Sequence, residues 1–251
     1  MTPKVNKQAV AQAFGRAAQS YNHHAQLQRL CGDRLMSLTD VSGYRQVLDA
    51  GCGSGWFSQR WRERGFQVTA LDLSPAMLAE AESGQVAHHY LQGDIDALPL
   101  PDGAVDLCWS NLAVQWCDDL QHAVNQLCRV TRAGGKVLFS TLAADSLSEV
   151  RAAWRQLDAA QHVNHFLSVE QIAGACAGKN LQLSQQRLTL AFPDVLAAMR
   201  SLKGIGATHL HQGRSAGLMT RQRLQQLEQF WPRDGRGCLL SYHLVFGVIS
   251  L

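Results

Sequence analysis

The sequence predicts an α/β domain whose mostly parallel sheet carries helices on both faces and binds a nucleotide-like ligand. An apolar run at residues 47–50 leads into three closely spaced glycines, G-C-G-S-G at residues 51–55. A second apolar run, residues 69–71, ends in Asp72. An apolar strand, a glycine turn, a helix start and a second strand ending in a carboxylate make up half of a nucleotide-binding fold.

The rest of the chain extends this pattern. From residue 47 to about residue 142, strand-like and helix-like segments alternate, giving five strands that must form a parallel sheet with right-handed crossovers. We expect two helices within 6–38, helices at 145–159 and 168–177, a strand within 181–192, helices within 193–236 and a last strand at 242–251. At 251 residues the chain fits one domain.

The glycine turn discriminates between nucleotide cofactors. A dinucleotide fingerprint is G-x-G-x-x-G, but Trp56 stands where its third glycine would be. Isolated glycine turns also occur in ordinary strand-to-helix corners, so the turn needs the support of Asp72, which can accept hydrogen bonds from ribose hydroxyls. Asp49, just before the turn, suits a cationic ligand better than a pyrophosphate. S-adenosylmethionine (SAM), with its ammonium and sulfonium groups, is such a ligand.

Further motifs appear in the order found in class I SAM-dependent methyltransferases, which the chain resembles. An acid, Asp94, follows the strand-like residues 89–91; residues 105–111 resemble the fourth strand, and residues 127–139 the helix, glycine turn and fifth strand that come next. This resemblance implies a Rossmann-like sheet of seven mostly parallel strands, with N-terminal helices and a helical insertion before the last strand. It also implies SAM as the cofactor.

The same resemblance assigns expected roles to individual residues. Gly51, Gly53 and Gly55 would let the backbone approach the ligand. Asp49 would hold the amino-acid end of SAM, and Asp72 would bind the ribose. Asp94, Ile95 and Leu73 would contact the adenine, and Asn111 and Leu112 would lie near the sulfonium.

Four segments found together resemble one family within this class more closely. They are F-G-R-A-A-Q-S-Y (14–21), D-A-G-C-G-S-G-W (49–56), S-N-L-A-V-Q-W-C (110–117) and M-R-S-L-K-G-I-G-A-T-H (199–209). They are similar to the malonyl-acyl-carrier-protein O-methyltransferases that open biotin synthesis. The implied reaction is methyl transfer from SAM to the free carboxylate of a malonyl thioester, carried by acyl-carrier protein or by coenzyme A.

Candidate catalytic residues follow from that chemistry. A cation could bind the carboxylate oxygen that does not attack, with Arg200 as the first choice and Lys203 as the second. Tyr21 could close the pocket near the methyl group. Residues 200–236 hold seven Lys or Arg against two acids, which fits an acidic carrier protein but also an ordinary solvated helical face. We expect substrate or carrier contacts from Arg16, His24, His209, Arg221 and Arg223.

Composition sets the wider expectations. Seven cysteines form no C-x-x-C pair, so we expect reduced thiols and no metal site. Without a signal-like N-terminus or a long apolar run, a cytoplasmic protein with no membrane partner is expected. Within the single domain, residues 1–42 would form a helical lid, 43–143 the SAM-binding core and 193–236 the substrate-binding insertion.

Three alternatives remain open from the sequence. A methyltransferase of another small carboxylic acid or of a quinone-type ring would share the SAM-binding half. A nucleic-acid methyltransferase would usually carry a denser basic surface, so we expect no nucleic-acid partner. A SAM-binding module without turnover is the alternative outside the enzymes.

Overall fold

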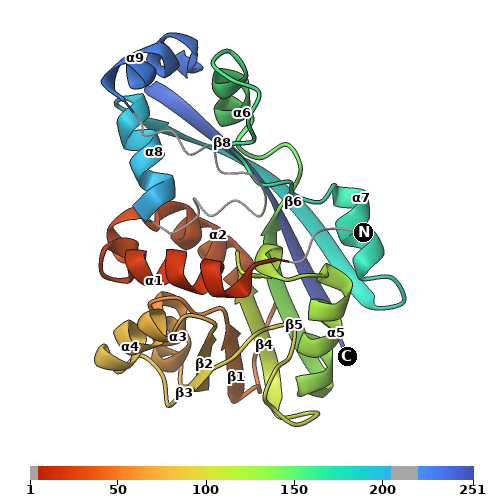
Figure 1. Cartoon of the computed structure of the whole chain (residues 1–251). Coiled ribbons are helices and arrows are strands. Elements are labelled where there is room, and N and C mark those ends of the chain that lie inside the picture. Colours follow the sequence, from red (N-terminus) through yellow and green to blue (C-terminus); the bar gives the residue numbers. More distant parts are fainter. Residues whose placement is uncertain (1–4, 205–219) are drawn as a thin grey trace.

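A single twisted sheet organises the molecule (Figure 1). The computed structural model describes residues 5–204 and 220–251. Its strands are β1 (Gln46–Ala50), β2 (Gln67–Asp72), β3 (His89–Gln92), β4 (Val105–Asn111), β5 (Thr131–Leu142), β6 (Asn180–Phe192), β7 (Arg233–Asp234) and β8 (Gly237–Ser250). Their order is β3-β2-β1-β4-β5-β8-β6, with β7 paired to β8. The first five strands pair in parallel and β8 runs antiparallel to β5 and β6, which confirms the predicted sheet.

The register of the central strands brings the candidate residues to one edge. Leu48 lies beside Thr69 of β2 and beside Cys108 of β4. Because these strands are parallel, their carboxyl ends meet at the same edge of the sheet. Asp72 and Asn111, the last residues of β2 and β4, therefore lie on either side of the glycine turn that follows β1.

Helices cover both faces of the sheet, as predicted. They are α1 (Lys7–His24), α2 (Gln26–Met36), α3 (Trp56–Glu63), α4 (Pro75–Ser83), α5 (Leu120–Val130), α6 (Ser148–Arg155), α7 (Val169–Ala175), α8 (Val195–Gly204) and α9 (Arg221–Phe230), with a short 3-10 helix η1 (Val114–Trp116). Ser168 caps α7 in a capping box with Gln171, as the sequence indicated.

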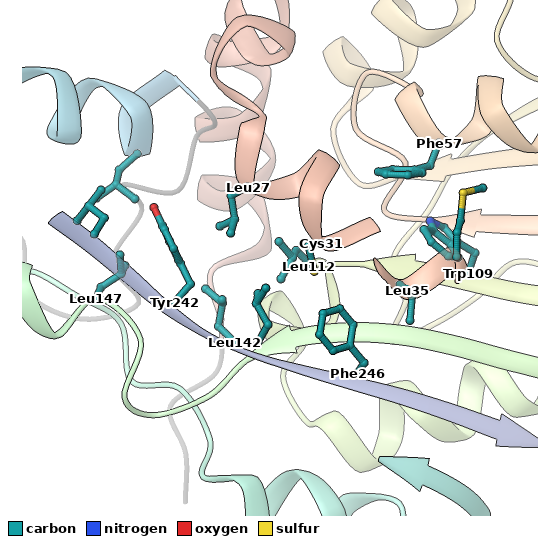
Figure 2. Packing of buried hydrophobic residues seen from close by; sticks show 14 of the residues in the cluster. Leu27, Cys31, Leu35, Phe57, Trp109, Leu112, Leu142, Leu147, Tyr242 and Phe246 are labelled. Atoms are coloured by element: carbon teal, nitrogen blue, oxygen red, sulfur yellow. The ribbon is translucent and has the colours of Figure 1, made fainter. Parts of the chain in front are cut away.

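Two apolar cores fill the two faces, because successive strand residues point to opposite sides. In β1, Val47 belongs to the core packed by α2 and α3, whereas Leu48 belongs to the core packed by α5 and α7. In β4, Trp109 and Cys108 divide in the same way. Figure 2 shows the first core, in which the ring centroids of Trp109 and Phe57 are 5.3 Å apart. This packing fixes the strand ends that carry the site.

The two predicted N-terminal helices, α1 and α2, lie over the carboxyl edge of the sheet (α1 is red in Figure 1). Asn6 caps α1 by accepting a hydrogen bond from the Ala9 amide. The buried positions Val10, Ala13 and Ala17 recur at helical spacing and face inward. The helices therefore cover the end of the sheet where a ligand would bind.

The segment between β6 and β8 departs from the sequence prediction in two details. The last strand begins at Gly237, five residues before the expected start at Tyr242, and pairs with β6 along its whole length, from Asn180 opposite Ser250 to Phe192 opposite Cys238. The two-residue strand β7 was not expected. In space, α8 lies against α1, and α9 packs on α6 and α8.

The remaining expectations concern cysteines, metals and membranes. All seven cysteines are free thiols. Within residues 5–204 and 220–251, no three His, Cys, Asp or Glu side chains gather in a way that could hold a metal ion. None of the helices within these residues is long and apolar enough to span a membrane.

Candidate functional site

Three glycines shape the turn after β1, and each has positive φ. At Gly51 (φ +81°) a Cβ would lie 2.3 Å from the Ala113 side chain, so only glycine lets these loops approach. A Cβ on Gly53 would face the ring of Tyr21 at 3.6 Å. Gly51 and Gly53 line the cavity at this edge. Gly55 lines neither of the two lobes described below; a Cβ at this position would lie 2.3 Å from the Val86 side chain, so the packing here requires glycine.

The cavity at the carboxyl edge has two adjoining lobes. The first lies between α1 and the ends of β2 and β3, and the second between α2 and the glycine turn. Tyr21, Gly51 and Asn111 line both lobes and mark where the lobes meet. The first lobe is also lined by the predicted residues Gly53, Asp72, Leu73, Asp94, Ile95 and Leu112, and the second by Asp49.

Asp72 is held in a fixed orientation in the first lobe. Its Oδ2 accepts a hydrogen bond from the Gly53 amide at 2.8 Å, and its Oδ1 one from the Ser74 amide at 2.8 Å. Burial raises the pKa of this carboxyl, and the amide hydrogen bonds oppose the rise. A carboxylate has about four acceptor positions, so each oxygen can still accept a ligand hydroxyl. The arrangement suits the two ribose hydroxyls.

Asp49 lies in the second lobe and is 2% exposed. Its Oδ2 accepts a hydrogen bond from the Ser58 hydroxyl at 2.6 Å. Burial raises the pKa of Asp49 to about 7, while the Ser58 hydrogen bond opposes that rise. No Lys or Arg among the described residues forms an ion pair with it. A buried carboxylate without a cation is matched to a cationic ligand group.

Two residues of α2 complete the second lobe and were not predicted from the sequence. The side-chain oxygen of Gln28, Oε1, is buried and has no hydrogen-bond partner among the described residues. Arg29 lies over the Trp56 ring at 5.0 Å and donates to the Asn22 carbonyl at 2.6 Å. An orphaned acceptor costs free energy unless a ligand donor satisfies it. The lobe therefore offers acceptors for an ammonium, and a cation, Arg29, for a carboxylate.

The end of β4 is fixed by a hydrogen-bond network at the junction of the lobes. Asn111 donates through Nδ2 to the Gln28 carbonyl at 3.0 Å and accepts through Oδ1 from the Ser140 hydroxyl at 2.8 Å. Leu112 adopts a left-handed conformation (φ +52°), and its amide donates to Ser140 Oγ at 3.0 Å. A non-glycine residue held at positive φ is costly, and such strain concentrates at functional sites.

Tyr21 comes from the last turns of α1 and is half-buried beside Gly53. Burial raises the pKa of its hydroxyl, and the carboxylates of Asp72 and Asp49 raise it further. The phenol therefore stays protonated at neutral pH and can donate a hydrogen bond, but it cannot act as a base there. Tyr21 lies where the two lobes meet.

The predicted substrate residues are more scattered. Arg200 and Lys203 lie on the exposed side of α8 and form no ion pair with another described residue. His24 is exposed at the end of α1, and Arg16 lines a shallow hollow between α1 and α4, outside both lobes. His209 lies outside the described residues.

The two predicted cations of α9 differ from each other. Arg223 forms an ion pair with Asp158 and lies over the Trp154 ring at 5.1 Å, so it joins α9 to α6. Arg221 is exposed and has no ion pair within residues 5–204 and 220–251. Two further cations of this segment are paired locally, Arg233 with Glu228 and Arg236 with Asp234. Arg221 is therefore freer than Arg223 to meet a partner.

Comparisons with known proteins identify the fold and the family. Residues 48–139 match the family described as Methyltransferase domain. Among solved structures, the YcgJ protein of Bacillus subtilis has a TM-score of 0.60 at 18% identity, covering 88% of this chain and 98% of that one. A SAM-dependent methyltransferase from Mesorhizobium loti has a TM-score of 0.52 at 19% identity, covering 87% and 96%. These similarities show the fold.

Two curated relatives extend the match to nearly the whole chain. A malonyl-acyl-carrier-protein O-methyltransferase of Erwinia billingiae is 64% identical over 245 residues, which covers 98% of each protein. Its counterpart in Salmonella typhimurium is 52% identical over 247 residues, again covering 98% of each. The chain therefore belongs to the malonyl-acyl-carrier-protein O-methyltransferase family and is a SAM-dependent methyltransferase.

Proposed function

We propose that this enzyme transfers a methyl group from SAM to the free carboxylate of malonyl-acyl-carrier protein, giving the malonyl methyl ester and S-adenosylhomocysteine early in biotin synthesis. The observation that carries the proposal is the 64% identity, over 98% of both chains, to a protein named for this reaction. The ester would hide a negative charge. Chain-elongating enzymes with pockets built for apolar acyl ends could then accept the product.

The residues of the two lobes fit SAM, which when bound supplies the methyl group and a neutral thioether leaving group. We assign the ribose to Asp72 and the adenine to Leu73, Asp94 and Ile95. Asp49 and Gln28 Oε1 would accept hydrogen bonds from the ammonium, which satisfies a buried carboxylate and an orphaned oxygen together. Arg29 would bind the carboxylate of the amino-acid end. The reacting centre would then lie at Tyr21, Gly51 and Asn111.

The acceptor needs alignment more than proton transfer. A malonyl carboxylate is ionised at neutral pH, so no general base is required. This agrees with Tyr21, whose raised pKa keeps the phenol protonated. We propose that the Tyr21 hydroxyl donates to the carboxylate and that its ring closes the pocket beside the methyl group. The enzyme would gain rate by holding oxygen, methyl carbon and sulfur nearly in line.

A cation is still needed to bring the carboxylate into a site with little water. Attack of an anion on a sulfonium gives neutral products, so a polar, hydrated site would stabilise the reactants more than the transition state. An unpaired carboxylate would resist desolvation. We propose that Arg200 binds the oxygen that does not attack, with Lys203 as the second candidate. Because α8 lies against α1, this assignment brings the clamp close to the helix that carries Tyr21.

The three parts of the domain would divide this work. Residues 1–42 would cover the cofactor as a helical lid, residues 43–143 would bind SAM, and residues 193–236 would bind the malonyl group and its carrier. Contact between α1 and α8 supports a joint role for the first and third parts. His24 and Arg16 line neither lobe, so we assign them to contacts on the outer surface of the protein.

The proposed reaction is tested by incubating the protein with methyl-labelled SAM and malonyl-acyl-carrier protein. Mass spectrometry of the carrier should show one added methyl group, and mild base should release it because it is an ester. Label that resists base, or that appears on the carrier without a malonyl group, would contradict the proposed acceptor.

Binding of SAM should depend on pH through Asp49. Its pKa of about 7 means that the carboxyl is neutral below pH 7 in the unliganded protein, whereas the ammonium of SAM favours the ionised form. Affinity should rise as pH increases through about 7, and binding should release a proton from Asp49. Calorimetry in two buffers of different ionisation enthalpy measures the proton. In Asp49→Asn this part of the dependence should vanish; an unchanged dependence would contradict the assignment.

The raised pKa of Asp49 also affects the stability of the folded protein, and as pH rises this effect is opposite in direction to the effect on SAM affinity. The unfolded chain has an ordinary Asp49 pKa, so between about pH 4 and about pH 7 the folded state retains a proton that the unfolded state has lost. Asp49 should therefore make the unliganded protein less stable as pH rises through that range. SAM should offset the loss by binding the ionised carboxylate.

Carrier docking should depend on salt. We propose that Arg221, exposed and without an ion pair among the described residues, helps to attract the acidic carrier protein. The kcat/KM for malonyl-acyl-carrier protein should fall as ionic strength rises, and Arg221→Ala should lower it a few-fold at low salt. Malonyl-pantetheine serves as the control, because it carries the malonyl group on an uncharged pantetheine without the acidic carrier protein. Equal salt dependence with both acceptors would remove the docking role.

A further inference from the structure

The N-terminal end of α1 carries a lysine that contacts the acid assigned to adenine. Lys7 Nζ lies 2.9 Å from Asp94 Oδ1 and 2.6 Å from Asp96 Oδ2. The side chains are 22%, 27% and 14% exposed, respectively, so this is a partly buried group of charges. Burial lowers the pKa of Lys7, but hydrogen bonds to Asp96 and Asp94 outweigh it, and the pKa is raised. Lys7 is therefore charged in this site.

The surrounding hydrogen bonds fix this group. The Asp96 amide donates to Asp94 Oδ1 at 3.0 Å, and the Asp118 amide donates to Asp96 Oδ2 at 2.8 Å. Just before α1, the Val5 amide donates to Asp118 Oδ1 at 2.7 Å. The start of α1 is thereby tied to the loops that follow β3 and η1. Lys7 supplies the positive charge that these neighbouring carboxylates require.

The two side-chain oxygens of Asp94 differ in their hydrogen bonds. Oδ1 receives both Lys7 and the Asp96 amide, whereas no described residue hydrogen-bonds to Oδ2. Asp96 Oδ1 is buried and also lacks a partner, so Asp96 depends on Lys7 for compensation of its charge. With Oδ1 held, Oδ2 is the oxygen of Asp94 that is left to accept a hydrogen bond from a ligand.

The same helix reaches the reacting end of the cavity. Lys7, Val10, Phe14 and Tyr21 all line the first lobe, at spacings that place them on one face of α1. Phe14 packs edge-on against Trp116, with centroids 5.3 Å apart. Near the other end of the helix, Ser54 Oγ of the glycine turn donates to Asn22 Oδ1 at 2.7 Å. Lys7 and Asn22 thus hold the helix near its two ends, Lys7 beside Asp94 and Asn22 beside the glycine turn.

We propose that Lys7 is a positioning residue for the cofactor: its ion pairs with Asp94 and Asp96 orient Asp94 toward the 6-amino group of adenine while holding α1 over the ligand. This rests on the proposed function only in placing adenine at Asp94. Its consequence is selectivity. Lys7 contributes to the affinity of ligands that carry the 6-amino group and little to those that carry a 6-oxo group instead.

The test compares two ligands that differ at that one group. S-adenosylhomocysteine and S-inosylhomocysteine are titrated by calorimetry into the wild type, into Lys7→Met and into Gln19→Met, an exposed position on α1 that serves as the matched control. Lys7→Met should weaken the binding of S-adenosylhomocysteine about tenfold, which corresponds to the loss of roughly one hydrogen bond to a charged group. It should change the affinity for S-inosylhomocysteine by less than about twofold, so the preference for the adenine-containing ligand should be smaller than in the wild type. Gln19→Met should leave both affinities unchanged.

Other results would overturn the proposal in distinguishable ways. Equal weakening of both ligands would mean that Lys7 only docks α1, with no role in orienting Asp94. An unchanged affinity for S-adenosylhomocysteine in Lys7→Met would remove both roles. A wild type without preference between the ligands would show that adenine does not bind Asp94 through its amino group. Because methyl transfer is not measured, none of these results depends on the acceptor; ester formation on malonyl-acyl-carrier protein tests that separately.

Discussion

Asp72→Ala is expected to weaken SAM binding by at least about a hundredfold. The assigned role gives Asp72 two hydrogen bonds from ribose hydroxyls, and hydrogen bonds to a charged group contribute about 1.5–3 kcal/mol each. The substitution also removes the acceptors of the Gly53 and Ser74 amides, which lie 2.8 Å from the carboxylate and set the turn around the cofactor. Titration calorimetry with SAM and with S-adenosylhomocysteine measures the loss.

A second substitution separates the two contributions of Asp72. Asp72→Asn keeps the size and one oxygen but replaces the other with a donor that opposes either the Gly53 or the Ser74 amide. Its loss of SAM affinity should be smaller than that of Asp72→Ala, because one oxygen remains to accept a ribose hydroxyl. A wild-type affinity of Asp72→Ala for SAM would mean that another residue binds the ribose.

Arg200→Ala should reduce kcat/KM for malonyl-acyl-carrier protein by about a hundredfold or more. Removing one member of a desolvated charge pair costs about 2–5 kcal/mol, because the remaining charge is left uncompensated. In the proposed complex that remaining charge is the malonyl carboxylate. SAM affinity should stay within about twofold of wild type, since Arg200 lines neither lobe of the cofactor cavity. Initial rates with labelled SAM, together with calorimetry, give both quantities.

Two control variants sharpen this test. Lys203→Ala should have a smaller effect if Arg200 is the clamp and a larger one if the assignments are exchanged. Arg34→Ala removes an exposed arginine of α2 that has no place in the proposed reaction, and its kcat/KM should stay at the wild-type value. Full activity in both Arg200→Ala and Lys203→Ala would refute a cationic clamp on α8.

Much of the fold was predictable because its core strands carry local signals. The apolar runs of β1 and β4 are buried on both faces, as parallel strands are, and the glycine turn and Asp72 stand where the strands end. The start of β8 was predicted five residues late. Residues 237–241 pair with β6, and that pairing joins segments more than forty residues apart, so local spacing does not indicate it.

The residues of the site also differ in how far the sequence alone indicates them. Asp49 and Asp72 belong to one continuous motif, so the sequence alone indicates them. Lys7, Gln28 and Arg29 are polar residues on amphipathic helices and look like solvent-exposed positions; only the docking of α1 and α2 on the sheet edge turns them inward. The signal that could have found them is their place on the helical face that also carries buried apolar residues.

Two of the predicted residues have neighbours that are distant in the sequence. Gly55 was expected to approach the ligand through its backbone; it lines neither lobe, and Val86 lies on the side where a Cβ would be. Arg223 was expected to be available to a carrier, but Asp158, 65 residues away, pairs with it. Local spacing contains no information about such contacts.

The most direct test of the account compares three acceptors under the same conditions: malonyl-acyl-carrier protein, malonyl-coenzyme A and free malonate, each with methyl-labelled SAM. Base-labile methyl ester is counted as an initial rate. The account predicts the fastest ester formation on the carrier-bound malonyl group and little on free malonate. Ester on none of the three, despite measurable SAM binding, would contradict the proposed acceptor while leaving the cofactor site in place.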